Sequence, residues 1–445
     1  MQTPRMAALQ LCCKMEQDDA YSNLLLQEYL RQQPMQEKDK HLLVRLVYGV
    51  TQQRLRLDYI ISQFSSVKPS RMKPMILNIL RLAVYQSECL DRIPDYALVN
   101  ESVELAKRNG LWSFSGFVNG VLRAYLRGRE TVEYPKAALH YMSTYYSYPQ
   151  WLVKLIRDKY KEKTEWILQQ GNRAPAASVR VNRTKLSPEA LQEQFRQENI
   201  ESHISAALED ALILKQGMDY ENNNSFQKGY FTPQDTSSML AARILAPQAS
   251  QTVIDVCSAP GGKTTYLAEQ MQNSGKIIAC DIYPHKLKLV QQAAKRLDIT
   301  IIETKQQDAA ECVAAWKGRA DRVLVDAPCS GLGIIRRKPE IKWTKSLADI
   351  RQLSILQYQI LQTASNYVKP GGELVYSTCT LTNEENNDVF YRFLREHPQF
   401  EAVDFSALVA EEWKPAAARG SLQILPGELD CDGFYIAKMK RIKES

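Results

Sequence analysis

Strand-like and helical segments alternate from about residue 236 to the end of the chain, and this alternation constrains the fold more than any other feature. Runs rich in β-branched and apolar residues occupy positions 252–256, 276–281, 299–303, 322–326 and 373–377. Such alternation predicts a domain at 236–445 built on a parallel sheet with helices on both faces. Ligands and reacting groups gather beyond the carboxyl ends of such strands. The residues that follow each run are therefore the candidates for a site.

The preceding residues predict two further domains. Residues 1–135 read as all helix, because apolar residues such as Leu42, Leu43 and Leu46 recur at helical spacing. Residues 136–235 predict a linker helix and a small α+β module, similar to an RRM in its βαβ order, with strands at 177–181 and 211–214. Asn182 and Arg183 in this module, with the aromatic and basic residues of 226–235, suit an RNA-stacking surface. An ordinary loop packed on the next domain explains them nearly as well.

Composition narrows the class of protein. A chain of 445 residues that is 44% hydrophobic and 24% charged is typical of a multidomain globular protein, with no apolar run long enough to span a membrane. The start, Met1 to Arg5, lacks an apolar signal core, which predicts a cytoplasmic protein. Nine cysteines without a Cys-x-x-Cys pair, and only five histidines, argue against a bound metal. A net charge of +7 leans toward a polyanionic partner.

A glycine-containing loop follows the first strand of the α/β domain. It reads Asp-Val-Cys-Ser-Ala-Pro-Gly-Gly-Lys-Thr-Thr at positions 255–265, which is neither the dinucleotide fingerprint nor a Walker A loop. Asp281 ends the next strand, where a carboxylate can accept hydrogen bonds from ribose hydroxyls, and Asp308 follows the third. Together these positions predict a site for S-adenosyl-L-methionine. The alternative is that Asp281 and Asp308 only cap helices.

Two cysteines follow the last two predicted strands. Cys329 lies in Asp-Ala-Pro-Cys-Ser-Gly-Leu-Gly at 326–333, and Cys379 lies in Ser-Thr-Cys-Thr at 377–380. A pair of thiols suits methylation at C5 of a cytosine, because one thiolate can add to C6 while the other helps to remove the C5 proton or release the product. Lys263 is a candidate for the positive charge that favours a thiolate, and Asp326 for a hydrogen bond to the N4 amino group.

The helical domain resembles the RNA-binding domain of the transcription antitermination factor NusB. The similarity lies in Leu-Val-Tyr-Gly-Val at 46–50, in residues 93–107, which begin Ile-Pro-Asp-Tyr-Ala, and in Gly-Phe-Val-Asn-Gly-Val-Leu-Arg at 116–123. It implies an RNA-binding role. Basic residues that could face phosphates are Arg54, Lys68, Arg71, Lys73 and Arg81. A solvated helix surface is the alternative interpretation of these basic residues.

The motifs at 257–263, 326–333 and 377–380, with Phe-Thr-Pro-Gln-Asp at 231–235, closely resemble the RNA cytosine-C5 methyltransferases of the NOL1/NOP2/Sun family. With the NusB-like domain, the resemblance covers nearly the whole chain. It implies a class I, Rossmann-like methyltransferase acting on 16S ribosomal RNA, free or in an assembling small subunit, with S-adenosyl-L-methionine as cofactor. Ser258, where alanine is usual, and Thr380, where serine is common, depart from the pattern.

The resemblance also implies roles for single residues. Cys379 is the nucleophile and Cys329 assists product release, with Asp326 and Lys263 beside them. The cofactor pocket is formed by Cys257, Ser258, Ala259, Pro260, Gly261, Gly262, Lys263, Asp281, Asp308 and Asp326. The residues near RNA are Arg336, Arg337, Lys338 and Lys342.

Two alternatives stay open at this point. A DNA cytosine-C5 methyltransferase would explain the Pro328-Cys329 dipeptide but not the Cys379 motif or the helical domain. A non-catalytic RNA-binding assembly factor would keep the fold without needing both cysteines. We expect a monomeric enzyme that needs no metal.

Overall fold

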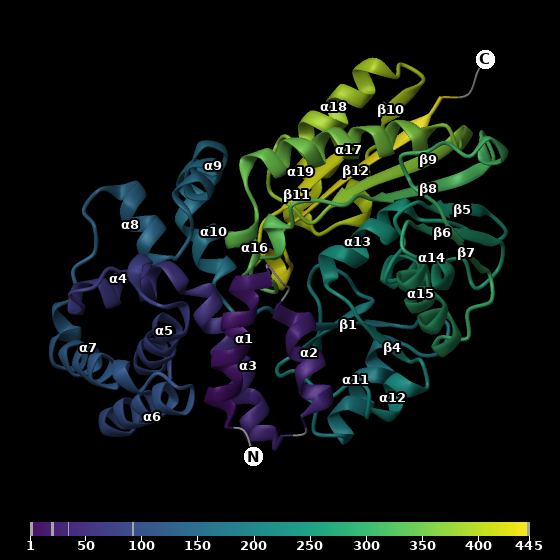
Figure 1. The fold of residues 1–445 in the computed structure, drawn as a ribbon. Coiled ribbons are helices and arrows are strands. Elements are labelled where there is room, and N and C mark those ends of the chain that lie inside the picture. Colours follow the sequence, from purple (N-terminus) through teal and green to yellow (C-terminus); the bar gives the residue numbers. More distant parts are fainter. Residues whose placement is uncertain (1–2, 19–21, 34, 91–92, 443–445) are drawn as a thin grey trace. The chain divides into compact units, whose positions relative to one another are not determined.

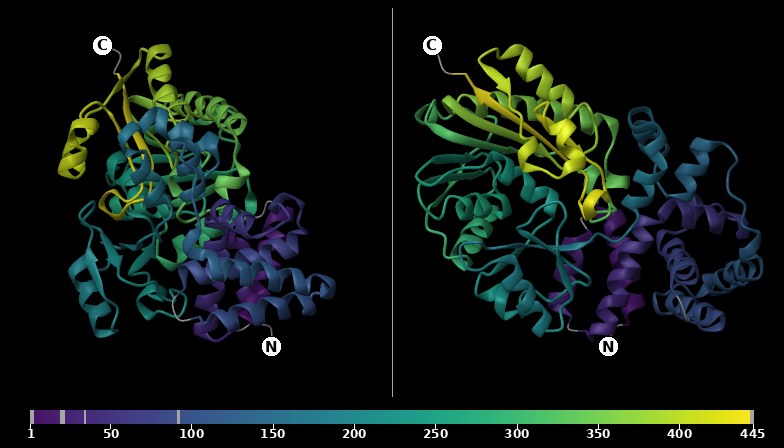
Figure 2. Two further views of the ribbon diagram at one scale, coloured as in Figure 1. Left: turned by 90° about the vertical axis from the view of Figure 1, so that its left-hand side faces the viewer. Right: turned by 180° about the vertical axis from the view of Figure 1, so that it is seen from behind.

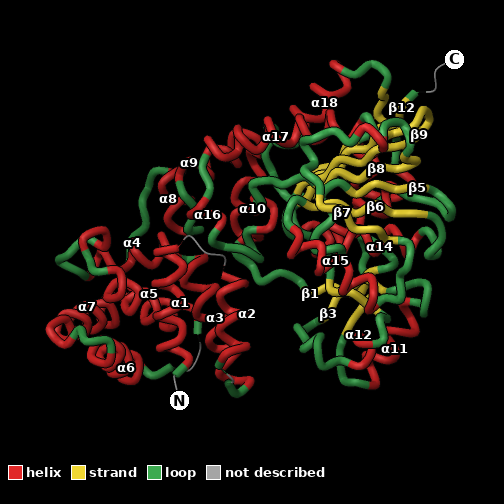
Figure 3. Tube along the Cα trace, turned by 45° about the vertical axis from the view of Figure 1, so that its right-hand side comes forward, coloured by secondary structure: helices red, strands yellow, loops and turns green. Residues whose placement is uncertain are grey.

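A computed structural model describes residues 3–18, 22–33, 35–90 and 93–442; Met1 and Gln2, on which the expectation about a signal segment partly depends, lie outside this range. The chain forms two compact units. One, here called the helical unit, comprises Met1–Arg173 with Ile335–Thr344, and the other, the catalytic unit, comprises Ala174–Ile334 with Lys345–Ser445. All strands of the described residues lie in the catalytic unit (Figure 3).

The helical unit is organised around helix α5, Pro74–Cys89, which is buried from Ile76 to Gln86. Helices α1, α3, α4, α6 and α7 all pack against it (Figure 1). The contact with α3 is close, because a Cβ atom at Gly49 would lie 1.9 Å from the ring of Tyr85. The helices are α1 Pro4–Asp18, α2 Ser22–Gln32, α3 Glu37–Gln52, α4 Arg54–Phe64, α5, α6 Asp95–Arg108, α7 Ser115–Gly128, α8 Ala138–Tyr145, α9 Gln150–Tyr160, α10 Thr164–Gly171 and α16 Ile341–Thr344.

The catalytic unit begins with a small module whose four strands pair antiparallel in the order β2-β3-β1-β4. Val179, Leu191 and Phe231 pack between this sheet and helix α11. The structure adds two short strands, β2 and β4, to the predicted βαβ order. The elements are β1 Ala177–Val181, α11 Pro188–Gln197, β2 Ser202–Ile204, β3 Ala211–Leu214, α12 Asn224–Gln227 and β4 Phe231–Pro233.

The large sheet has the order β10-β12-β9-β8-β5-β6-β7, with β11 beside β12. The five strands predicted from sequence are parallel to one another, although the third lies at Ile302–Gln306 and not at 299–303. Strands β10, β11 and β12 pair antiparallel, so the sheet is mixed. Figure 2 shows β12, in yellow, along the green strand β9. The strands are β5 Thr252–Asp255, β6 Lys276–Asp281, β7 Ile302–Gln306, β8 Ala320–Asp326, β9 Val368–Thr378, β10 Phe400–Ala402, β11 Ser421–Ile424 and β12 Phe434–Arg441.

Alternate residues of these strands enter two cores. Val253 and Leu324 pack with α13 and α14 on one face, whereas Ile254 and Val323 pack with α17 on the other, as the two-residue period of a strand requires. The chain order reverses between β5 and β8, which is where open α/β sheets bind their ligands. The helices are α13 Thr236–Leu245, α14 Gly262–Gln270, α15 Pro284–Arg296, α17 Leu347–Ser365, α18 Asn387–Glu396 and α19 Lys414–Ala417.

No helix in the described ranges is both long and apolar enough to cross a lipid bilayer.

Candidate active site

Two cysteines meet where strands β8 and β9 end. These strands are parallel neighbours with Asp326 in register with Ser377, so the loops that follow them start side by side. Cys329 Sγ and Cys379 Sγ lie 3.2 Å apart, and both side chains are partly exposed. The loops also touch through Gly333, whose N–H donates to Cys379 O at 2.9 Å. A Cβ at Gly333 would lie 2.9 Å from Cys379 O and 2.1 Å from Gly433 O, so these close approaches require glycine.

Electrostatic surroundings shift the pKa of one thiol of the pair, Cys329. The hydrogen bond to Cys379, then burial and the nearby Glu385 carboxylate, raise that pKa well above its usual value. Cys329 therefore keeps its proton near neutral pH. Either sulfur could be the donor in the hydrogen bond between the two cysteines.

Asp326 and Lys263 form an ion pair beside the cysteines. Lys263 Nζ lies 2.8 Å from Asp326 Oδ2, and Ser377 donates its hydroxyl to Asp326 Oδ1 at 2.8 Å. The ammonium group also lies over the Phe434 ring, 5.2 Å from its centre. The charge of Lys263 is therefore balanced by a carboxylate, and its role in favouring a thiolate stays a prediction.

The glycine loop that we predict to bind the cofactor turns sharply before helix α14. Gly261 adopts a φ of +107°, and a Cβ there would lie 3.1 Å from the backbone of Val290. Ser258 fixes the loop to the end of β6, because its N–H and hydroxyl both donate to Cys280 O, at 2.7 and 2.9 Å. The loop thus presents backbone and a helix N-terminus at the reversal point of the sheet, where a ligand carboxylate is favoured.

Three aspartates follow or end the strands around this loop. Asp255 is fully buried; its Oδ2 accepts from the Thr264 hydroxyl at 2.7 Å, and its Oδ1 has no partner among the described residues. Burial raises the pKa of Asp255 to about 7. Asp281 and Asp308 each use Oδ1 to cap a backbone N–H, of Tyr283 and Ala310, both at 2.9 Å. Capping thus accounts for the Oδ1 atom of Asp281 and of Asp308, and it leaves the Oδ2 atom of each for a ligand.

Arg180 of strand β1 reaches helix α14 from the small module. Its side chain is fully buried and forms a two-point ion pair with Glu269 of α14, at 2.8 and 3.1 Å. It also donates to Gly262 O at 2.5 Å and to Gln234 Oε1. Sequence reasoning missed this residue, because nothing in a strand reading Ala-Ser-Val-Arg-Val marks its arginine as buried.

Several side chains that we expected to contact RNA are buried. Asn182 is 1% exposed and structures its own turn, donating to Gly229 O, whereas Arg183 is about half exposed. Arg81 of the helical unit is 2% exposed and pairs with Asp58 and Glu16. Neither Asn182 nor Arg81 has side-chain surface with which to contact RNA.

The basic segment 336–342 lies in the helical unit, and its residues differ in burial. Lys342 is fully buried, with its Nζ donating to Gln52 O and Ser147 O at 3.1 Å and to Asn172 Oδ1 at 2.6 Å. Arg336 is 7% exposed. The expectation of an RNA contact is therefore wrong for Lys342. At Arg336 only a small part of the side chain is exposed and could contact RNA. Arg337 and Lys338 are partly exposed and stay candidates.

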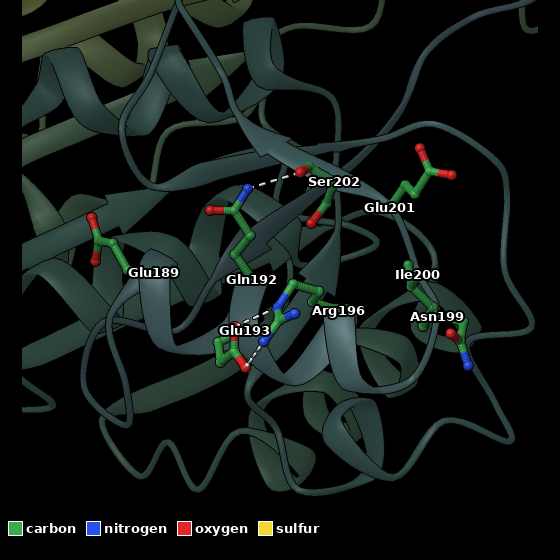
Figure 4. A pocket seen from close by; sticks show the side chains of 8 residues that line it. All are labelled: Glu189, Gln192, Glu193, Arg196, Asn199, Ile200, Glu201 and Ser202. Atoms are coloured by element: carbon green, nitrogen blue, oxygen red, sulfur yellow. Dashed lines mark hydrogen bonds and ion pairs between the residues drawn. The ribbon is translucent and has the colours of Figure 1, made fainter.

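A pocket of about 560 Å³ lies on the small module, between α11 and β2 (Figure 4). Its lining carries Glu189, Glu193 and Glu201, and Arg196 forms a two-point ion pair with Glu193 at 2.8 Å (Figure 4). The carboxylates of this lining would repel the phosphate backbone of a nucleic acid. This pocket contains none of the predicted site residues.

The α/β sheet, the glycine loop at its reversal point and the paired cysteines define a methyltransferase carrying an N-terminal helical domain. Three families match successive parts of the chain: the NusB family at residues 2–127, an RsmF/B-like ferredoxin-like domain at 148–221, and 16S rRNA methyltransferase RsmB/F at 242–440. The chain belongs to the ribosomal RNA small subunit methyltransferase B family. The predicted fold class and the two resemblances are confirmed.

Individual relatives support this membership. The probable ribosomal RNA small subunit methyltransferase B of Bacillus subtilis (strain 168) is 41% identical over 438 residues, 98% of each chain. The Vibrio cholerae enzyme is 35% identical over 411 residues, covering 92% of this chain and 91% of its own. The crystal structure of PH0851 has a TM-score of 0.83 at 26% identity, covering 98% of this chain and 99% of that one.

A more distant likeness concerns the fold alone. The crystal structure of NSun6 from Pyrococcus horikoshii with SFG has a TM-score of 0.56 at 23% identity, covering 66% of this chain and 99% of that one. The DNA methyltransferase alternative and the non-catalytic alternative gain no support from any of these likenesses.

Proposed function

We propose that the protein methylates C5 of a cytosine in 16S ribosomal RNA, using S-adenosyl-L-methionine and a covalent adduct between Cys379 and C6. The observation that carries the proposal is the 3.2 Å separation of the Cys329 and Cys379 sulfurs at the ends of adjacent strands. The names of the curated relatives supply the class of RNA. On this proposal the enzyme acts as a monomer in the cytoplasm, on free RNA or on an assembling subunit.

The chemistry needs a nucleophile because C5 of an intact cytosine does not attack a methyl group. The Cys379 thiolate forms a bond to C6, the C5–C6 double bond opens, and C5 becomes nucleophilic like the carbon of an enamine. After C5 has gained its methyl group, C5 loses its proton, the double bond re-forms and the Cys379 sulfur leaves as a thiolate. A second group is therefore needed to receive the C5 proton.

Cys329 has the position for that second role. The hydrogen bond to Cys379 is the largest cause that raises the pKa of Cys329. When the Cys379 sulfur is bonded to C6 it no longer raises that pKa, so the Cys329 thiol can lose its proton to water, and its thiolate then accepts the C5 proton. Asp326, held from two sides by Lys263 and Ser377, accepts a hydrogen bond from the N4 amino group and orients the ring. Catalysis then depends on Cys379 for addition and on Cys329 for release.

The chain fits the cofactor at the reversal point of the sheet. The loop residues Cys257 to Lys263 would hold the amino-acid part, and the second carboxylate oxygens of Asp281 and Asp308 would accept hydrogen bonds from hydroxyl or amino groups. S-adenosyl-L-methionine supplies an electrophilic methyl group when it is bound. Lys263 and Asp326 connect this loop to the cysteine pair through their ion pair.

A trapping experiment tests the assignment of the two thiols. RNA that carries 5-fluorocytosine cannot lose a proton from C5, so the adduct to the nucleophile should persist on a denaturing gel in the presence of cofactor. We expect Cys379→Ala to abolish the adduct and Cys329→Ala to retain it. The reverse pattern would assign the nucleophile to Cys329 and contradict the proposal.

A further inference from the structure

A buried carboxylate joins the two cysteine loops from behind. Glu385, six residues after Cys379, is 0% exposed. Its Oε1 accepts from the Ser330 N–H at 2.8 Å and from Gln357 Nε2 at 3.1 Å. Its Oε2 accepts hydroxyl hydrogen bonds from Ser330, Thr382 and Thr380, at 2.6, 2.9 and 3.2 Å.

These donors come from both sides of the cysteine pair. Ser330 directly follows Cys329, and Thr380 directly follows Cys379, so one carboxylate holds the residue next to each thiol. The two hydroxyls also lie 2.6 Å apart. Gln357 of α17 donates to Pro328 O at 2.9 Å, so the residues on both sides of Cys329 are fixed to the same group of side chains.

A fully buried charge is costly unless donors fill its lone pairs, and removing one partner leaves the others unpaired. Five donors satisfy Glu385, which makes the arrangement stable but sensitive to the carboxylate itself. The hydrogen bond from Gly333 N–H to Cys379 O also joins the two loops, but Gly333 lies three residues beyond Ser330. The position of the Cys329 thiol therefore depends on the side-chain hydrogen bonds. The carboxylate charge is also one of the causes that raise the pKa of Cys329.

We propose that Glu385 is the positioning residue of the cysteine pair: it holds Cys329 against Cys379, so that addition and release occur at one site. The catalytic part of this inference rests on the proposed function, whereas the spacing of the two sulfurs does not. Glu384 provides a matched control, because it is the neighbouring glutamate and is exposed.

Cross-linking measures the spacing without any reaction on RNA. Dibromobimane joins two nearby thiols, each sulfur displacing one bromide, and peptide mass spectrometry identifies the Cys329–Cys379 product among the products of the nine cysteines. We expect Glu384→Gln to cross-link at the wild-type rate and Glu385→Ala to do so about tenfold more slowly, because loss of the shared acceptor frees both loops. An unchanged rate in a Glu385→Ala protein that melts as a folded species would overturn the proposal.

If Glu385→Ala does not fold, Glu385→Gln decides the question, since it keeps the shape but loses the charge. Its cross-linking should be slower than that of Glu384→Gln by about threefold, because the amide nitrogen cannot accept a hydrogen bond and hydrogen bonds to the amide oxygen are weaker than those to a carboxylate. Equal rates in Glu385→Gln and Glu384→Gln would then reject the positioning role.

Kinetics separate positioning from general damage. A misplacement of the pair by about 1 Å should lower kcat about 100-fold. Equilibrium dialysis should show an unchanged Kd for S-adenosyl-L-methionine, and the adduct to 5-fluorocytosine RNA should still form through Cys379. A parallel loss of cofactor affinity would indicate a merely structural role. If the wild type forms no adduct, the proposed function fails, while the cross-linking result still decides the role of Glu385.

Discussion

At the scale of single residues, Asp255 shows how burial changes the chemistry of a carboxyl group at the sheet edge. It is fully buried with one hydrogen bond, and its pKa is raised from 3.8 to about 7. Between these two values the folded protein binds a proton that the unfolded chain has lost. The contribution of Asp255 to stability is therefore fully present below about pH 4 and is lost as the pH rises to about 7.

Asp255→Asn should remove this pH dependence, because an amide does not titrate. Urea unfolding at pH 5 and pH 8 should show that the free energy of unfolding of the wild type falls by about 3 kcal/mol relative to the variant. The hydrogen bond with Thr264 has an acceptor in both proteins, so the comparison isolates the charge. Parallel curves would show that Asp255 titrates near its ordinary value in the folded state.

At the scale of secondary-structure elements, the ion pair between β1 and α14 connects the small module to the helix that follows the glycine loop. Arg180→Met should lower the free energy of unfolding by about 3–5 kcal/mol, because Glu269 is left buried without a partner. Replacing Glu269 by Met as well should restore part of the loss. Urea unfolding measures both, with Arg183→Met as the control because Arg183 is about half exposed.

The same pair predicts an effect on the cofactor site. Arg180 donates to Gly262 O in the loop, so Arg180→Met should raise the Kd for S-adenosyl-L-methionine, whereas Arg183→Met should not. A variant that loses stability but keeps its cofactor affinity would show that Arg180 supports the domain without shaping the loop.

The sequence predicted the elements whose residues carry a local signal. The five parallel strands and the Gly261–Gly262 turn follow from short runs of apolar and β-branched residues and from glycine, which are local signals. The antiparallel strands β10 to β12 were missed, although 434–437 is also a short apolar run. Arg81, Arg180 and Lys342 looked like ordinary basic surface residues, since their burial depends on partners far away in the chain, such as Glu269 for Arg180. Glu385 was missed for the same reason.

At the scale of the whole molecule, the chain enters the helical unit twice, as residues 1–173 and as residues 335–344. The second of these segments, 335–344, begins six residues after Cys329, and the Lys342 side chain holds it with three hydrogen bonds. The loop of Cys329, which we propose to be catalytic, is therefore continuous with a segment that belongs to the helical unit.

Lys342→Met should destabilise the helical unit by about 2 kcal/mol, because Gln52 O, Ser147 O and Asn172 Oδ1 lose their donor in a buried place. Thermal unfolding measures the change, and Lys14→Met, at an exposed lysine of the same unit, is the control. Equal melting temperatures for the two variants would show that Lys342 contributes no net stabilisation.

The most direct test of the two-thiol mechanism uses Cys329→Ala with unmodified 16S ribosomal RNA and S-adenosyl-L-methionine. Addition and methyl transfer need only Cys379, whereas release needs Cys329, so the variant should accumulate a covalent protein–RNA complex. Mass spectrometry of the digested complex should find 5-methylcytidine attached to the peptide that contains Cys379. Normal turnover by Cys329→Ala, or attachment through any other residue, would contradict the account.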